Sequence, residues 1–315
     1  MNSKTNPLLS GALVLATTTL LAGNAHASSY AVATDNIRNG SVTPNGGGIT
    51  FGPVMSNSSS AASLSNSGVS FAAIGPNPDA PVSALGSASG RGNETAGPVY
   101  YTLLGNTGGN YSWGDAIVNQ EQGPNATITT RNAAESNIAT EGFANADGTN
   151  KSSTGLTVNT ANCSGACTIS FAFQADPYIA TSVDAGALPG SVARGTLGFD
   201  ITLTRASDNT IVFNWTPNGA PGGIIGGTET SDPENLNLTL AALTGQSLSH
   251  SGPYGAGTFA SYAATTGALS SGAYTLSIFT NEKTDVVRAI PEPETYALML
   301  AGLGVLGFVA RRRRF

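Results

Sequence analysis

The stretch TLGFDITLTRASDNTIVFNW, residues 196–215, carries the clearest fold signal in the chain. In its first nine residues, Leu197, Phe199 and Ile201 alternate with glycine, aspartate and threonine. Such alternation is typical of a half-buried strand in an antiparallel sheet. The RASD segment that follows has turn composition. Residues 196–215 therefore predict a β-hairpin with its loop near residues 206–209.

Further short segments on both sides of this hairpin have strand character, and turn residues separate them. They are residues 98–104, 125–130, 167–174, 235–243 and 272–279. Neither a strand–helix rhythm nor a repeat of fixed period is present, which argues against a doubly wound fold, a propeller or a solenoid. We therefore expect an all-β protein, an antiparallel β-sandwich of jelly-roll or immunoglobulin-like type with long Gly/Ser/Asn-rich loops.

The strand signal is weaker before residue 98, where low-complexity Ser/Gly/Ala segments separate short apolar islands at residues 48–54 and 68–74. We expect residues 28–97 to be a loop-rich N-terminal part of the β body, contributing edge or meander strands. We expect residues 98–289 to form the sandwich body.

The composition restricts the kinds of partner. Only 10% of the 315 residues are charged, and residues 28–290 hold 8 basic and 17 acidic residues, a net charge of −9. A nucleic-acid-binding protein needs basic side chains to replace phosphate counterions, so this acidic body predicts no nucleic-acid partner.

The chain begins with the pattern of a signal peptide. Lys4 precedes an apolar stretch from Leu8 to Ala22, and Ala25 and Ala27 place small residues at the cleavage site. We predict that residues 1–27 direct export through the Sec machinery and are removed after Ala27. The alternative is an uncleaved N-terminal anchor.

The chain ends in IPEPETYALMLAGLGVLGFVARRRRF, residues 290–315. Pro291, Glu292 and Pro293 precede an apolar run, residues 297–310, which as a helix would be about 21 Å long. We expect a short C-terminal transmembrane helix, extended chain outside the membrane at the Pro-Glu-Pro triplet, and a cytoplasmic basic cluster. That cluster consists of Arg311, Arg312, Arg313 and Arg314.

The triplet, the apolar run and the arginines, in this order, closely resemble the PEP-CTERM sorting signal of Gram-negative bacteria. The resemblance covers residues 290–315 and implies recognition by an exosortase, a membrane cysteine protease-transpeptidase that cuts at or near the triplet. It further implies an inner-membrane intermediate and a destination at the cell surface or in the extracellular matrix. The alternative is a plain C-terminal tail anchor.

Cys163 and Cys167 are the only cysteines. In an exported protein, two cysteines this close predict a disulfide, here before the strand at residues 167–174. The alternative, a redox site, has the wrong spacing for a Cys-x-x-Cys motif.

The other candidates for chemistry are scattered. The acidic residues Asp176, Asp184, Asp200 and Asp232-Pro233-Glu234 could serve a hydrolase or bind Ca²⁺, but their spacing matches no known calcium loop. His250 and the glycine-rich residues 222–227 read as surface loops. A sugar-binding face could be built from aromatic residues, namely Tyr100, Tyr101, Tyr111, Trp113 and Tyr254.

From these observations we expect an exported, non-enzymatic surface or matrix protein with no catalytic residues and no cofactor other than a weakly indicated Ca²⁺. Its role would be structural or adhesive in the exopolysaccharide or biofilm layer. The alternatives are a carbohydrate-binding adhesin with a specific site and, less favoured, a secreted hydrolase.

Overall fold

The computed structural model describes most of the chain, with gaps. The described residues are 27–65, 69–76, 79–85, 101–106, 109–121, 126–139, 145–161, 163, 167–250, 257–290 and 293–312.

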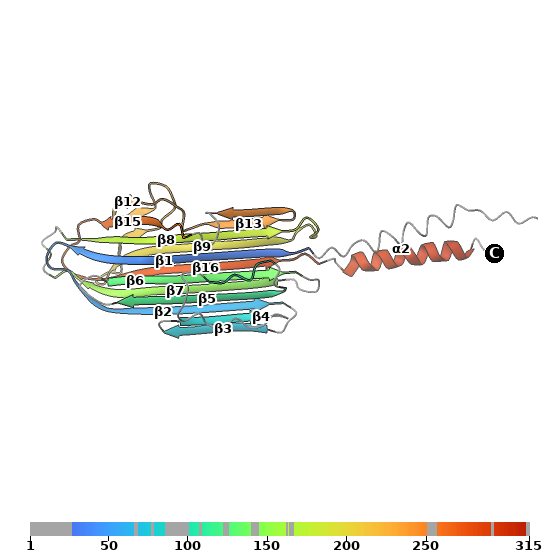
Figure 1. Cartoon of the computed structure of the whole chain (residues 1–315), viewed down its shortest axis with the longest axis horizontal. Coiled ribbons are helices and arrows are strands. Elements are labelled where there is room, and N and C mark those ends of the chain that lie inside the picture. The colour runs from blue at the N-terminus through green and yellow to red at the C-terminus, as the bar shows by residue number, and fades with distance from the viewer. Residues whose placement is uncertain are drawn as a thin grey trace, which may run out of the picture.

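Long antiparallel strands build two eight-stranded sheets, called here sheet A and sheet B (Figure 1). Sheet A has the order β12-β15-β8-β1-β6-β5-β4, with β14 also on β8. Its strands are β1 (Ser29–Asn45), β4 (Asp79–Leu85), β5 (Tyr111–Glu121), β6 (Ala126–Ile138), β8 (Thr168–Val183), β12 (Gly227–Ser231), β14 (Gln246–His250) and β15 (Ala260–Thr266).

Sheet B has the order β11-β10-β9-β16-β7-β2-β3, with β13 also on β9. Its strands are β2 (Thr50–Leu64), β3 (Val69–Pro76), β7 (Asn145–Asn159), β9 (Val192–Arg205), β10 (Ile211–Trp215), β11 (Ile224–Ile225), β13 (Thr239–Leu243) and β16 (Ala273–Val287). The predicted antiparallel all-β class is confirmed. The choice between a jelly-roll and an immunoglobulin-like topology stays a prediction.

The predicted hairpin is β9–β10, in which Trp215 pairs with Ile201 and Phe213 with Leu203. Along β9 the residues that alternate in the sequence do so in space, since Leu197, Phe199 and Ile201 are buried. These side chains face sheet A, because a strand turns successive side chains to opposite faces.

The interior changes character along the strands. Near the end where β9 joins β10, aromatic and branched side chains fill it, and we call this part the aromatic half. Phe173 stacks on Tyr262 with ring centroids 4.9 Å apart and meets Trp215 at 5.6 Å. Its buried members include Ile169, Phe171, Phe173, Phe199, Ile201, Leu203, Phe213, Trp215, Tyr262, Tyr274 and Leu276.

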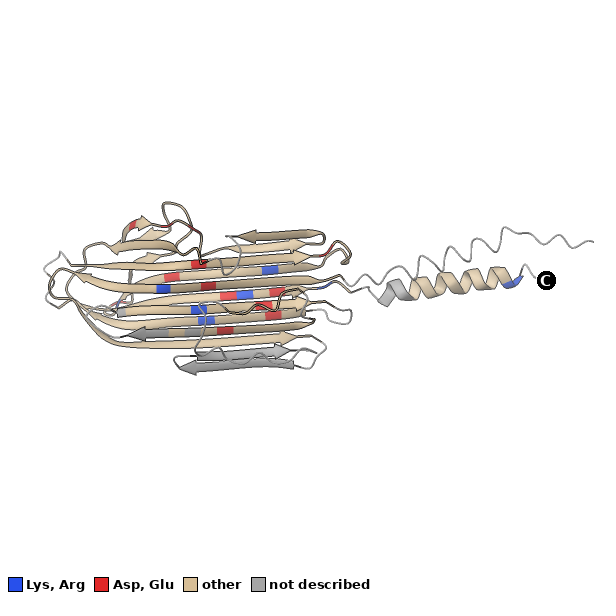
Figure 2. Cartoon of the chain, in the orientation of Figure 1, with Lys and Arg blue, Asp and Glu red and all other residues tan. Residues whose placement is uncertain are grey.

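Further along the same strands the interior is largely polar between β1, β5, β6, β7 and β16, and we call this part the polar half. Apolar clusters lie beside it, around Leu197, and beyond it, around Val286. The two sheets come very close there: a Cβ on Gly114 of β5 would lie 2.6 Å from the carbonyl oxygen of Thr149 in β7. Figure 2 shows that the charged residues also lie in bands along the middle of the long strands. The buried inner side chains of the polar half are Asp35, Ser58, Ser60, Ser112, Asn132, Ser136, Asn150, Ser152, Thr280, Glu282 and Thr284.

The described residues between 28 and 85 are mainly strand, in a region that we expected to be loop-rich with edge or meander strands. β1 lies between β6 and β8 in sheet A, and β2 is a strand of 15 residues next to β7. Their inner serines lie in a polar interior, whereas Asn39, Asn45 and Asn57 are exposed. Strands with low intrinsic β-propensity are thus held by neighbouring strands and by buried polar contacts.

One predicted strand is absent. Within residues 98–104, the described part, residues 101–104, is irregular, and Tyr101 is buried. This segment covers the outer face of sheet A rather than joining a sheet, because the Tyr101 hydroxyl donates to the carbonyl oxygen of Arg131 in β6 (3.0 Å).

Candidate functional site

The C-terminal segment folds as helix α2 (Pro293–Arg312), which extends away from one end of the body (Figure 1). Proline suits the first helical position because its missing N–H would have no partner there. Arg311 and Arg312 occupy the last turn, where the helix dipole favours positive charge. Pro291, Glu292, Arg313 and Arg314 lie outside the described residues.

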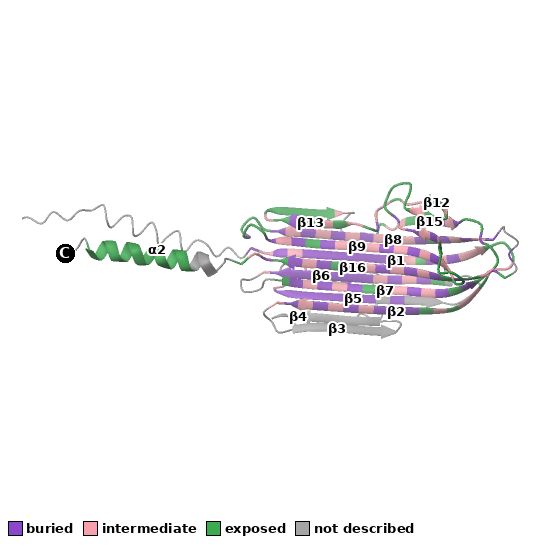
Figure 3. Cartoon of the chain, turned by 180° about the vertical axis from the view of Figure 1, so that it is seen from behind, coloured by how far each residue is buried: buried purple, intermediate pink, exposed green. Residues whose placement is uncertain are grey.

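Residues 297–312 of helix α2 are exposed, and Figure 3 colours this part of the helix green. Leu298 is 74% exposed and Phe308 is 68% exposed. Among the helical residues that the structure describes, no helix is long and apolar enough to cross a membrane. The helix is therefore where the sequence places it, but the transmembrane part of that prediction is not supported.

Both termini of the body lie at the same end, which we call the terminal pole. β1 begins there and β16 ends there, since Ser29 pairs with Val183 and Val287 pairs with Val192 across the 184–191 connection. The backbone N–H of Ala289 donates to Ser191 Oγ (3.1 Å), so the body is ordered up to the residues that precede the Pro-Glu-Pro triplet.

The segment next to the predicted signal-peptidase site is also anchored at this pole. Ser28 donates to Asp184 Oδ2 through its backbone N–H (2.7 Å) and its hydroxyl (2.9 Å), and the Asp184 N–H donates to the Ser28 carbonyl oxygen. Ala27 is buried, while Ala25 and residues 1–24 lie outside the described residues.

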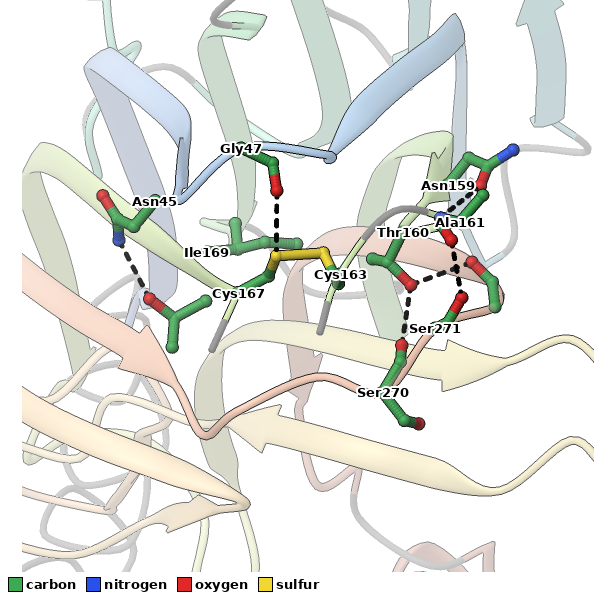
Figure 4. The surroundings of a disulfide bond; sticks show 12 residues. Asn45, Gly47, Asn159, Thr160, Ala161, Cys163, Cys167, Ile169, Ser270 and Ser271 are labelled. Carbon is green, nitrogen blue, oxygen red and sulfur yellow. Dashed lines mark hydrogen bonds between the residues drawn. A yellow bond between two sulfur atoms is a disulfide. The ribbon is translucent and has the colours of Figure 1, made fainter. Parts of the chain in front are cut away.

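The Cys163–Cys167 disulfide lies at the opposite end of the body, the distal pole (Figure 4). Cys163 N–H donates to the Thr160 carbonyl oxygen, and Leu269 N–H donates to that of Cys167. Cys167 Sγ also lies 3.3 Å from the carbonyl oxygen of Gly47. The predicted bridge therefore fastens the β7–β8 connection beside the 46–49 and 267–272 connections.

Three of the five aromatic residues named as a sugar-binding face are not on the surface. Tyr101, Tyr111 and Trp113 are buried around Glu135, whose Oε2 accepts from Trp113 Nε1 at 2.7 Å. Glu135 also accepts the Leu104 and Gly105 N–H groups. The Glu135 carboxylate therefore holds residues 101–105 against the outer face of sheet A. Tyr100 and Tyr254 lie outside the described residues.

A different aromatic residue is half-exposed on the outer face of sheet B. Phe279 of β16 has Ser153 and Asp200 as its cross-strand partners. Beside it runs a chain of polar groups in which Asn214 Nδ2 donates to Thr202 Oγ1 (3.0 Å), and Thr202 donates to Asp200 Oδ1 (3.0 Å). We call Ser153, Asp200, Thr202, Asn214 and Phe279 the Phe279 platform.

The platform combines a ring face with hydroxyl, amide and carboxylate groups on a flat sheet. Gly155 and Gly198 lie diagonal to Phe279 on the two neighbouring strands. Because glycine has no side chain, neither position covers the Phe279 ring. Burial raises the pKa of Asp200, while the bond from Thr202 acts in the opposite direction. The sequence holds a signal for this site: Tyr274, Leu276 and Ile278 face inward, so Phe279 is an aromatic residue at an outward position.

Asp232, one of the acidic candidates, has a structural role. Asp232 Oδ2 accepts the backbone N–H groups of Asn218 and Gly219, so it closes a loop. Among the described residues, no group of three or more histidine, cysteine, aspartate or glutamate side chains is arranged to hold a metal ion.

Two segments interpreted as loops are partly strands. His250 ends β14, which pairs with β8. Residues 222–227 contain β11 and the first residue of β12, and a Cβ on Gly226 would lie 1.9 Å from the Val212 carbonyl oxygen. Glycine is needed there for this close approach, and its φ of +69° also favours glycine.

The described residues form an all-β body followed by a C-terminal helix. Residues 289–314 match the family model described as the PEP-CTERM protein-sorting motif, which confirms the resemblance found in the sequence. No curated protein and no solved structure matches the chain. The chain thus carries the motif of an exosortase-targeted protein, with a cell-surface or extracellular destination.

Proposed function

We propose that this chain is a structural or adhesive protein of the exopolysaccharide or biofilm layer, delivered there by exosortase processing. The sorting motif at residues 289–314 is the observation that carries the proposal. In this proposal the Sec machinery exports the chain, and helix α2 holds it at the inner membrane as an intermediate. An exosortase then cuts at or near the Pro-Glu-Pro triplet.

The arrangement of the termini supports such processing. β16 ends at Val287 and Ile290 is 57% exposed, so a cut at residues 291–293 lies beyond the last strand. The exposed apolar side chains of α2 are available to lipid or to a membrane enzyme without unfolding the body. With both termini at the terminal pole, the distal pole and both outer sheet faces point away from the attachment point.

A processing experiment tests this proposal. We expect the protein recovered from the cell surface of its host to end near residues 291–293 by intact mass, and to retain residues 311–314 when the exosortase gene is deleted. A variant with alanine at Pro291, Glu292 and Pro293 should accumulate uncut. A surface product that keeps Arg311 to Arg314 while the exosortase is active contradicts the proposal.

The second candidate is a carbohydrate-binding adhesin with a specific site, and the Phe279 platform favours it. Aromatic faces bind the apolar faces of sugar rings, and neighbouring amide and carboxylate groups bind their hydroxyls. A catalytic role is the least supported reading, because Asp232 accepts two backbone N–H groups in its loop and Asp184 binds Ser28 at the terminal pole.

Binding separates the two readings. In affinity electrophoresis with the exopolysaccharide of the host, a specific adhesin should lose most of its retardation when Phe279 is replaced by alanine. Thr275→Ala is the matched control, since Thr275 lies on the same face of β16. Equal retardation of both variants favours a structural role without a specific site, as does a lack of retardation of the unaltered protein.

A further inference from the structure

Two acidic side chains face each other inside the polar half. Asp35 of β1 is 2% exposed, and Glu282 of β16 is 0% exposed. Asp35 points inward from sheet A and Glu282 points inward from sheet B, so both carboxyls lie between the sheets. Neither residue belongs to the sorting segment or to the Phe279 platform.

Cross-sheet hydrogen bonds locate Glu282 within this interior. Ser136 and Thr284 share one bond of 2.7 Å, and four residues earlier on each strand Asn132 Nδ2 donates to Thr280 Oγ1. The inner residue midway between Asn132 and Ser136 is Ala134, so Glu282 faces an alanine. Ala33 is the neighbour of Ala134 on β1. Two small side chains therefore lie opposite the Glu282 carboxyl in the space between the sheets.

The same register brings Asp35 beside this space. Asp35 is the cross-strand partner of Asn132. On the opposite sheet, Asn150 is the cross-strand partner of Glu282. Two carboxyl and two amide side chains, one of each from each sheet, therefore surround one small region.

Five side-chain oxygen atoms of this region lack a hydrogen-bond donor. Among the described residues, no partner is found for Asp35 Oδ1, for either carboxyl oxygen of Glu282, or for the amide oxygens of Asn132 and Asn150. The single unpartnered donor in the group is Asn150 Nδ2. A proton on Glu282 would not satisfy these atoms, because it adds one donor to a set of acceptors.

Among the residues that the structure describes, no positive side chain is found to pair with the two acids. Lys151 and Lys283, next to Asn150 and Glu282, are exposed on the outer face of sheet B. Arg131, next to Asn132, lies 6.0 Å from the Tyr101 ring. The buried Arg288 is six residues beyond Glu282, about 20 Å along the strand. Burying two unpaired carboxylates would be costly.

We propose that a hard divalent cation, Ca²⁺ in the extracellular setting, binds between the sheets to the side-chain oxygens of Asp35, Glu282, Asn132 and Asn150. Ca²⁺ takes six to eight oxygen ligands, and carboxylate and amide oxygens are its usual protein ligands. Zinc would need histidine or cysteine, which this region lacks. Burial and the nearby Asp35 charge raise the pKa of Glu282, as expected for acids without a cation.

Metal content and thermal stability test the proposal on the exported protein, folded in millimolar CaCl₂ and then desalted. We expect about one Ca²⁺ per chain by elemental analysis. Dialysis against EDTA should lower Tm by roughly 5 °C or more, and added Ca²⁺ should restore it. Glu282→Gln should lose the bound Ca²⁺. Asp208→Asn, which alters an exposed turn carboxylate, should retain it.

Circular dichroism shows whether the Glu282→Gln variant folds. The double variant, Asp35→Asn with Glu282→Gln, provides a second test. This double variant removes both buried charges, so we expect it to fold with a Tm that neither Ca²⁺ nor EDTA alters. The proposal is overturned if the unaltered protein holds no stoichiometric cation and its Tm ignores Ca²⁺ and EDTA. It is also overturned if Glu282→Gln folds and binds Ca²⁺ as before.

Discussion

The aromatic half and the polar half are built on the same long strands but are held together by different forces. In the aromatic half, rings such as Phe173, Tyr262 and Trp215 fill the space between the sheets. In the polar half, glycines bring the backbones together, and serine, threonine and asparagine side chains bond across the gap. The first half gains stability from apolar area, the second from close approach and hydrogen bonding.

The difference teaches how a chain so rich in serine and asparagine can form two large sheets. A hydrogen bond between small polar groups contributes only about 1 kcal/mol net, since water competes for the same groups in the unfolded chain. The polar half therefore depends on strands that the aromatic half has already aligned. It also leaves some oxygens without partners, as Asp35 and Glu282 show.

The largest expected effect is at Trp215, whose side chain is fully buried and donates to Glu229 Oε1 (2.7 Å). Trp215→Ala should lower the free energy of unfolding by about 3–5 kcal/mol, since it leaves a cavity among aromatic rings. Ser152→Ala, its counterpart in the polar half, should cost only about 1 kcal/mol. Chemical denaturation measures both losses, and equal losses would remove the distinction between the halves.

The next effect concerns pH in the absence of divalent cations. Burial, with a contribution from Asp176, raises the pKa of Asp35 to about 7, from an ordinary value of 3.8. Between these values the folded chain keeps a proton that the unfolded chain releases. Stability should therefore fall as the pH rises from about 4 to 7, by up to about 4 kcal/mol, with Glu282 acting in the same direction.

Denaturation in EDTA at several pH values tests this trend. Asp35→Asn should remove part of the fall, and Asp208→Asn should leave it intact because Asp208 lies in an exposed turn. Stability that rises across this range in the unaltered protein would show that the two acids are compensated within the polar half.

The aromatic half was largely predictable from the sequence, whereas the polar half was not. Alternation of Leu197, Phe199 and Ile201 with small or polar residues marks β9 and its inner face, because burial of apolar side chains leaves a period of two. In β2, the run SNSSSAASL has no such contrast, since serines occupy inner and outer positions alike. Only the neighbouring strands decide that these residues form a strand.

The candidate sites also differ in how far the sequence predicts them. The sorting motif is local and was read directly from residues 290–315. The Phe279 platform and the Asp35–Glu282 pair are assembled from strands distant in the sequence, so only the register brings their members together. The sequence suggests a surface of aromatic residues, but Tyr101 is buried within a segment that forms no strand, and Trp113 is buried in β5.

A smaller effect should follow from loss of the disulfide at the distal pole. Cys163 and Cys167 are separated by four positions, and closing so short a loop restricts the unfolded chain by about 2 kcal/mol. Replacing both cysteines by serine should lower the free energy of unfolding by about this amount. Reduction of the unaltered protein should give a similar loss, whereas reduction of the double variant should give none.

The smallest effect should come from Asp184 at the terminal pole, which binds the backbone N–H and the hydroxyl of Ser28. If the signal peptide is removed after Ala27, the Ser28 nitrogen becomes a charged ammonium group, and a hydrogen bond becomes an ion pair. Asp184→Asn should then cost about 1 kcal/mol in the processed chain at low salt, and less at high salt because the pair is exposed. In a chain that keeps residues before Ser28, the loss should be smaller and independent of salt. Equal losses in the two forms, unaffected by salt, would mean that Ser28 does not begin the mature protein or that its charge contributes nothing to stability.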